Sequence, residues 1–288
     1  MKILITGAAG QVGRALIKTA PADSELIALT HAQLDIADLE SVRRCVADCR
    51  PTVVINAAAY TAVDRAEADE ESAYRTNVSG AGNLARCAAD VDARLLHLST
   101  DFVFSGDQVR PYAPEDLPGP VNVYGTTKLA GEKAVQQLLP EGSAVLRAGW
   151  IYSATGQNFL TSILARLRQG QGVRVVSDQV GTPTSADSVS TMVWTVIAEQ
   201  AWGGVLHWSD AGVASWYDFA VAIAEEAAHA GLIDSPGEVV PIRSHEYPTA
   251  ARRPVNSVLD TRNSMGLAPG VQMHWRQNLR VVLGALAA

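Results

Sequence analysis

Residues 2 to 13, Lys-Ile-Leu-Ile-Thr-Gly-Ala-Ala-Gly-Gln-Val-Gly, decide the fold of this chain. Lys2 to Thr6 is a short apolar run, as expected of a parallel strand buried on both faces. Gly7, Gly10 and Gly13 follow, and a helical pattern begins at Arg14. A glycine turn between strand and helix lets the backbone approach a phosphate, and the helix N-terminus adds N–H donors. The stretch predicts a dinucleotide site.

The rest of the first half repeats strand-helix-strand units. These units predict an α/β fold, a Rossmann-type doubly wound parallel sheet with right-handed crossovers. We expect residues 1–150 to form the NAD(P)-binding domain and 151–288 mainly a smaller C-terminal substrate-binding domain. Segments near 184–208 are expected to pack back on the first domain. The predicted strands are 25–29, 52–56, 94–98, 173–177 and 205–208, and the predicted helices are 72–90, 184–200, 215–229 and 274–287.

Composition limits the classes of partner. The net charge is −7, without a basic stripe, which argues against nucleic acid. No apolar run approaches the roughly 18 to 20 residues of a membrane helix, and the apolar start is too short for a signal peptide. No His/Cys cluster has zinc spacing. We therefore expect a cytoplasmic protein without a membrane segment or a structural metal.

Several residues are expected around the cofactor. The second strand ends at Thr30 and His31, where an acidic residue often meets the ribose 2′-hydroxyl, so its absence favours NADPH over NADH. Arg14 is a possible 2′-phosphate ligand. Asp35 and Ile36 could grip an adenine ring or cap a helix. The small residues that precede Tyr60 and Thr61 either let the cofactor lie against the backbone or serve packing alone.

A second set of residues suggests proton transfer. Tyr124 and Lys128 lie four apart on one face of a predicted helix. A nearby ammonium and an oxidised nicotinamide are expected to lower the pKa of the phenol. Thr100 follows a predicted strand, where it could donate a hydrogen bond to a substrate carbonyl oxygen. Alternatively, the lysine is solvated beside a half-buried ring, and the hydroxyl satisfies a turn.

Two later loops have the composition of substrate loops. One is the rigid stretch 178–184, which contains Gln179, and the other is 251–257, which contains Arg253 and Asn256. The second loop is punctuated by proline and arginine and could clamp a diphosphate. A surface ion-pair loop is the alternative.

The motifs GAAGQVG, INAAAYTAVDRAE, LSTDFVF, NVYGTTKLAGEKAV, LRAGWIY, SDQVGTPT and RRPVNS cover most of the chain. Together they resemble the extended short-chain dehydrogenase/reductase family, in its branch that reduces 4-keto sugar nucleotides. The resemblance implies hydride transfer from NADPH or NADH to the C4 ketone of dTDP-4-dehydro-L-rhamnose, giving dTDP-L-rhamnose for cell-surface polysaccharide.

The resemblance also implies roles for individual residues. Tyr124 would be the proton donor, Lys128 its electrostatic partner and ribose ligand, and Thr100 the group that polarises the carbonyl. Asp101 and Trp150 fall on sugar-nucleotide positions. The implied cofactor contacts are Gly10, Gln11, Val12, Thr30, Asp35, Ile36, Ala59, Tyr60, Thr61 and Leu98.

Two positions depart from the family pattern. Phe102 stands where a tyrosine often follows Thr-Asp. Ala15 stands where some members carry a glutamate that holds a dimer-bridging Mg²⁺. We therefore expect a monomer or weak homodimer, with a Mg²⁺ requirement in doubt.

Other functions remain open at this stage. A nucleotide-sugar epimerase of the same superfamily would retain its NAD, and a dehydratase would need an Asp-Glu pair after the threonine, where this chain has Asp101 and Phe102. A non-catalytic dinucleotide-binding protein is the third possibility, because the regulatory subunit of methionine adenosyltransferase also resembles this family.

Overall fold

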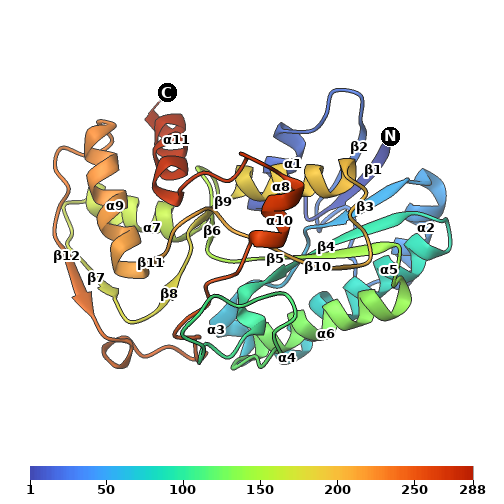
Figure 1. Ribbon diagram of the computed structural model, residues 1–288, viewed down its shortest axis with the longest axis horizontal. Helices are drawn as coiled ribbons and strands as arrows, with labels where there is room; N and C mark the ends of the chain where they lie inside the picture. The colour runs from blue at the N-terminus through green and yellow to red at the C-terminus, as the bar shows by residue number, and fades with distance from the viewer. Residues whose placement is uncertain (288) are drawn as a thin grey trace.

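A six-stranded parallel sheet organises the first of two bodies of the molecule (Figure 1). The computed structural model describes residues 1–287. The strand order is β10-β5-β4-β3-β1-β2. The sequence order of the strands reverses between β1 and β3, as in a doubly wound fold, while all strands stay parallel. The predicted α/β fold class is confirmed. The sheet strands are β1 Lys2–Thr6, β2 Glu25–Leu29, β3 Val53–Asn56, β4 Arg94–Thr100, β5 Ser143–Ala148 and β10 Gly204–Trp208.

Helices cover both faces of this sheet. α1 (Gln11–Lys18) and α8 (Ala186–Ala198) lie side by side on one face and share an apolar core with the strands. The opposite face is covered by α2 (Leu39–Cys49), α5 (Ala81–Ala89) and α6 (Val123–Leu138). Each helix buries residues at spacings of three or four, so the sheet is enclosed as expected for parallel strands.

The helical stretch predicted at 72–90 is one interrupted helix. It consists of α4 (Glu70–Tyr74), a π-helical turn at Arg75–Gly80, and α5. The π turn inserts residues into the helix and directs the buried Asn77 inward. Side-chain periodicity alone did not reveal this interruption.

The second body is built from three helices and a short parallel strand pair, β7 with β12. Its apolar core joins α7, α9 and α11, at the far left of Figure 1. Short strand pairs, β6 with β9 and β8 with β11, line the path between the bodies. The elements are β6 Ile151–Tyr152, α7 Phe159–Arg168, β7 Val173–Val176, β8 Val180–Gly181, β9 Thr184–Ser185, β11 Ala214–Ser215, α9 Trp216–His229, β12 Val239–Ile242 and α11 Trp275–Ala287.

The chain crosses between the bodies more than once. After β6 to β9 it returns to the first body through α8 and β10, and β10 pairs in parallel with β5. It then leaves again for α9 and β12. Two short helices, α3 (Val63–Ala66) and α10 (Arg262–Leu267), lie between the larger elements. No helix within residues 1–287 is long and apolar enough to cross a membrane.

Candidate active site

The turn after β1 is shaped to take a phosphate. Gly7 has a φ of +71°, and a Cβ there would lie 2.6 Å from the Ala57 backbone. A Cβ at Gly13 would lie 2.3 Å from the Gly7 carbonyl oxygen, so the helix can pack this closely only with glycine. α1 begins after Gly10 without a side-chain cap. Its first N–H groups therefore face the turn, as a dinucleotide diphosphate requires.

Gln11 links this turn to the second body. Its Oε1 accepts hydrogen bonds from Ser153 Oγ at 3.0 Å and from Asn158 Nδ2 at 2.9 Å. Asn158 also caps α7. The Gln11 side chain thus joins the glycine turn to the start of α7, which leaves its backbone N–H for a ligand, while the Val12 side chain is buried in the core.

The residues expected to bind the adenosine part of the cofactor differ in their exposure to a ligand. Thr30 Oγ1 donates to Gln33 Oε1 at 2.9 Å, and Asp35 accepts from the Ala37 N–H at 3.0 Å. The Ile36 side chain is 2% exposed and packs against Gly80 in the core. The Ile36 side chain therefore offers a ligand almost no surface, and its predicted contact with adenine stays a prediction.

The loop after β3 is held by the π turn. Asn77 Oδ1 accepts from the Tyr60 N–H at 2.8 Å, and its Nδ2 donates to the Tyr60 carbonyl and to Thr127 Oγ1. This fixes the segment of Ala59, Tyr60 and Thr61 against α6. The Tyr60 hydroxyl is buried and has no hydrogen-bond partner within residues 1–287. Such an orphaned group fits a site whose polar partner is a bound dinucleotide.

Thr100 and Asp101 stand at the carboxyl end of β4, which is two residues longer than predicted. Thr100 Oγ1 accepts from the Phe102 N–H and donates to Asp101 Oδ1 at 3.1 Å. Asp101 is buried, and its Oδ2 has no partner within the described residues. Burial raises the pKa of this carboxyl to about 6, against the lowering effect of hydrogen bonds from Ser257 and Thr100.

Tyr124 lies in the first turn of α6, which Asn122 caps. The ring is half-buried and contacts Phe102 edge-on, with centroids 5.9 Å apart. Burial of the hydroxyl and the charge of Asp101 raise its pKa to about 12, although a hydrogen bond from Thr100 opposes this. The expected lowering of the phenol pKa is therefore wrong for the chain's own groups. The reason is the desolvation of the buried hydroxyl, which the sequence did not show.

Lys128 is 2% exposed, so the alternative of a solvated lysine is excluded. Its Nζ donates to the Leu98 carbonyl oxygen at 2.6 Å. Burial lowers the pKa of the ammonium to about 8, and the charge of Glu132 opposes that shift. The structure thus brings Thr100, Tyr124, Lys128 and the backbone of Leu98 to one edge of the sheet, beside the glycine turn.

The expected substrate residues other than Thr100 and Asp101 are engaged with other parts of the chain. Trp150 has a φ of +53° and stacks on Trp216, with centroids 3.5 Å apart. Gln179 donates to Ser244, and Arg253 forms a bidentate ion pair with Asp64, with its shorter contact at 2.7 Å. Gln179 and Arg253 line a pocket, and Trp150 reaches its edge only through the stack on Trp216, whereas Asn256 does not line it.

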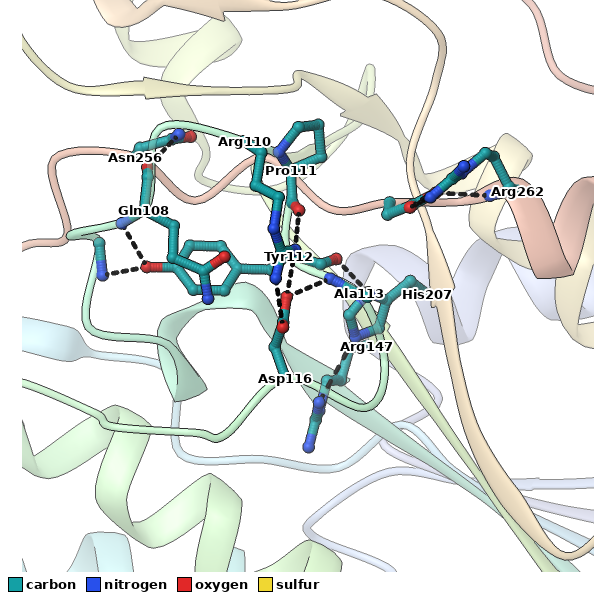
Figure 2. Close-up of polar contacts among 12 residues, drawn as sticks. Gln108, Arg110, Pro111, Tyr112, Ala113, Asp116, Arg147, His207, Asn256 and Arg262 are labelled. Atoms are coloured by element: carbon teal, nitrogen blue, oxygen red, sulfur yellow. Dashed lines mark hydrogen bonds and ion pairs between the residues drawn. The ribbon is translucent and has the colours of Figure 1, made fainter.

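Asn256 instead anchors the loop of residues 105–120, as Figure 2 shows. Its Nδ2 donates to the Gln108 carbonyl at 2.8 Å, and its Oδ1 accepts from the Val258 N–H. Within the loop, the Tyr112 hydroxyl accepts from the Gly106 and Gln108 N–H groups. The geometry gives Asn256 a loop-holding role, and a substrate contact of this residue stays a prediction.

A pocket of about 300 Å³ opens in the second body. It combines aromatic rings with cationic side chains from helix, strand and loop. Sequence reasoning missed Phe159, Arg166 and Trp216, although Phe159 and Arg166 lie seven apart on one face of α7. Its lining includes Phe159, Arg166, Arg174, Gln179, Trp216, Tyr247 and Arg253.

A phosphate-binding glycine turn beside a Thr-Tyr-Lys set, with a second body that carries a pocket, defines an oxidoreductase of the extended short-chain dehydrogenase/reductase class. The model of the RmlD substrate binding domain matches residues 1–288. The chain belongs to the dTDP-4-dehydrorhamnose reductase family.

Two relatives illustrate the sequence similarity. A dTDP-4-dehydrorhamnose reductase from Mycolicibacterium smegmatis is 41% identical over 99% of this chain and 86% of its own length. A dTDP-4-keto-6-deoxy-D-glucose reductase from Streptomyces niveus is 39% identical over 94% of this chain and 93% of its own length.

Two solved structures have the same fold over nearly the whole chain. A dTDP-4-dehydrorhamnose reductase from Clostridium acetobutylicum gives a TM-score of 0.93 at 37% identity and covers 100% of both chains. The Bacillus anthracis dTDP-4-dehydrorhamnose reductase, solved in complex with NADP, gives 0.91 at 32% identity and covers 98% of both.

Proposed function

We propose that this chain reduces the C4 ketone of dTDP-4-dehydro-L-rhamnose to the alcohol, the step that yields dTDP-L-rhamnose. The observation that carries the proposal is the convergence of Thr100, Tyr124 and Lys128 beside the glycine turn in a member of this family. NADPH or NADH would supply the hydride. Residues 1–150, with the returning 184–208 segment, would bind the cofactor, and 151–288 mainly the sugar nucleotide.

The protonation state of Tyr124 suits a reduction. A phenol whose pKa is raised to about 12 carries its proton at neutral pH and can give it to the ketone oxygen as negative charge develops there. Thr100 would donate a second hydrogen bond to the same oxygen. Lys128 would orient the cofactor ribose and, as a nearby cation, ease the loss of the phenol proton.

The pocket in the second body is proposed to take the nucleotide part of the substrate. Trp216 and Tyr247 offer aromatic surface for a pyrimidine base, and Arg166 offers positive charge for a diphosphate. Trp150, two residues after β5, stacks on Trp216 and so connects this pocket to the catalytic edge. Arg253 would bind the diphosphate by sharing its guanidinium with Asp64.

We propose that the protein accepts NADPH and prefers it to NADH. The end of β2 carries Thr30 and His31 instead of an acidic residue, so these two side chains do not repel a 2′-phosphate. Arg14, exposed on the first turn of α1, could bind that phosphate. The NADP complex of the Bacillus anthracis relative supports this preference.

A monomer or weak dimer is proposed, without a bridging Mg²⁺. Ala15 packs in the core between α1 and α8 and carries no metal-binding atom. No group of three or more His, Cys, Asp or Glu within residues 1–287 is arranged to hold a metal ion. A light-scattering mass that is dimeric and falls on adding a chelator would contradict the proposal. A cytoplasmic location also stays a prediction.

The activity test follows loss of reduced-nicotinamide absorbance with NADPH and with NADH in turn. Oxidation that depends on dTDP-4-dehydro-L-rhamnose is the expected result. The Streptomyces niveus relative makes dTDP-4-keto-6-deoxy-D-glucose the second substrate to test. No net oxidation with either sugar, together with retained NAD, would favour an epimerase. A stoichiometric synthetase partner in the absence of reductase activity would favour a regulatory subunit.

The pocket has its own test. Trp216→Ala should raise KM for the sugar nucleotide about tenfold, the scale of one lost aromatic stack with its apolar contact, and leave KM for the cofactor unchanged. Trp202→Ala, which removes a tryptophan that lies outside the pocket, is the matched control. An unchanged sugar-nucleotide KM in Trp216→Ala would remove the pocket from substrate binding.

A further inference from the structure

A chain of buried polar side chains lies beneath the catalytic lysine. It runs from Thr6 at the end of β1 to Asn56 at the end of β3, then to His97 in β4 and to Lys128 in α6. His97 has no exposed surface, and the other three are at most 2% exposed. No sequence motif points to a role for Thr6, Asn56 or His97.

The orientation of Asn56 is fixed by a backbone donor. Its Oδ1 accepts from the Ala58 N–H at 3.1 Å and from Thr6 Oγ1 at 2.8 Å. A backbone N–H can only donate, so the atom that faces it must be the amide oxygen. The Asn56 Nδ2 group therefore faces His97 Nδ1, at 3.0 Å.

The tautomer of His97 follows from this contact. An amide NH₂ can only donate, so His97 Nδ1 accepts and carries no proton. Burial, and after it the charge of Lys128, lowers the pKa of His97 well below its ordinary value, so the ring is neutral. A neutral imidazole that accepts at Nδ1 has its proton on Nε2. His97 thus points an N–H group at Lys128 Nζ, 3.5 Å away.

An N–H group that faces an ammonium cannot hydrogen-bond to it, whereas it can donate to the lone pair of a neutral amine. One Lys128 hydrogen goes to the Leu98 carbonyl oxygen. We propose that His97, locked by Asn56 with its proton on Nε2, is a positioning residue that turns the remaining Lys128 hydrogens toward the catalytic cleft and loosens the bound proton. The proposal deepens the proposed reductase function and rests on it.

The other titratable groups around Lys128 are accounted for. Tyr124 and Glu132 lie one helical turn before and after it on α6, and Glu132 is paired with Arg147 of β5. Asp101, which follows β4, faces Tyr124. Glu132 favours the ammonium, whereas the Nε2–H group of His97, by the tautomer derived above, opposes it.

A second buried histidine provides an internal reference. His207 Nδ1 lies 3.0 Å from the Tyr112 carbonyl oxygen, as drawn in Figure 2. A carbonyl oxygen only accepts, so His207 carries its proton on Nδ1, the opposite tautomer to His97. The contact partner on its other side is Arg147 Nη1, at 3.4 Å.

The test of the tautomer is nitrogen-15 NMR of the histidine-labelled, full-length protein, which needs no activity. The signal lost in His97→Gln should show a protonated Nε2 and a bare Nδ1, whereas the His207 signal should show the reverse. Asn56→Asp, which replaces the donor with an acceptor, should move the His97 proton to Nδ1. A protonated Nδ1 on His97 in the unmodified chain would overturn the proposal even if the protein is a fully active reductase.

The effect on Lys128 is tested by the pH profile of kcat/KM in the reductive direction. His97→Leu removes the opposing N–H group. The basic limb of the kcat/KM profile should therefore move up by about one pH unit, the scale of one hydrogen-bonding dipole beside a charge. His207→Leu is the matched control, because His207 does not contact Lys128, and its limb should stay in place. A basic limb that does not move in His97→Leu would contradict the proposal and assign His97 a structural role alone.

Discussion

Glu132 and Arg147 form a bidentate ion pair in the interior, with contacts of 2.9 Å from Nε and 2.7 Å from Nη2. Glu132 also accepts from Ser99, next to Thr100, and lies one turn after Lys128. The pair therefore joins α6 to β5 behind the candidate active site.

Breaking this pair should destabilise the fold. Glu132→Gln leaves the Arg147 guanidinium buried without a counter-charge, and we expect a loss of about 3–5 kcal/mol in the free energy of unfolding. Urea unfolding measures it. The double variant Glu132→Gln/Arg147→Met should recover a large part of the loss. Losses that simply add would show that the two side chains are not energetically coupled.

Tyr124→Phe should lower kcat by about 10² to 10⁴-fold, because it removes the proton donor. Cofactor affinity should change little, since the ring and its contact with Phe102 remain. Single-turnover rates and cofactor titration separate the two effects. Tyr74→Phe, at a 53% exposed position outside the site, is the control. A full rate in Tyr124→Phe would assign proton donation to another group.

Asp101 should make stability depend on pH. Its folded pKa of about 6 lies above its ordinary value of 3.8, so the folded state binds more protons between those values. The contribution of Asp101 to the free energy of unfolding is complete below pH 4 and is lost as pH rises through 6. Asp101→Asn should therefore gain stability relative to the unmodified chain on going from pH 4 to pH 7. The difference between the two proteins in urea unfolding cancels the similar contribution of Asp210.

Gly13→Ala should abolish cofactor binding and destabilise the fold, because the new Cβ would lie 2.3 Å from the Gly7 carbonyl oxygen. Gly284→Ala is a matched control in α11, where a Cβ meets nothing within 4 Å. It should stabilise the protein by about 0.5–1 kcal/mol. Calorimetric titration with NADPH and thermal unfolding give both answers. Normal NADPH binding by Gly13→Ala would show that the turn can open without harm.

The local features of the fold could be predicted from the sequence. Apolar runs such as Lys2 to Thr6, the glycine turn and the spacing of Tyr124 and Lys128 are properties of neighbouring residues, so they can be read in one dimension. The electrostatics of the site could not be read in the same way. The pKa of Tyr124 depends on burial by groups that only the fold brings together, whereas the sequence pointed only to the nearby lysine and the expected nicotinamide.

The pocket and the chain of buried polar side chains could not be predicted for the same reason, since their residues are brought together only by the fold. Trp216, Tyr247 and Arg166 come from separate elements of the second body. Asn56 and His97 lie on separate strands, and their hydrogen bond depends on the register between β3 and β4. Asn77 is turned inward by a π turn that helical periodicity conceals. The hydrogen bond by which Asn256 holds a neighbouring loop joins residues that are distant in the sequence, so it could not be predicted either.

The sheet cannot be completed until β10, its last strand in the sequence, has been synthesised. All six residues of β5 are buried, and β10 covers one of its edges. A ribosome-bound chain that ends near residue 150 has not yet made that covering strand. Until about sixty further residues have emerged, the nascent sheet presents an open apolar edge, the kind that invites pairing between chains. Slow translation through this interval should therefore raise the demand for chaperones.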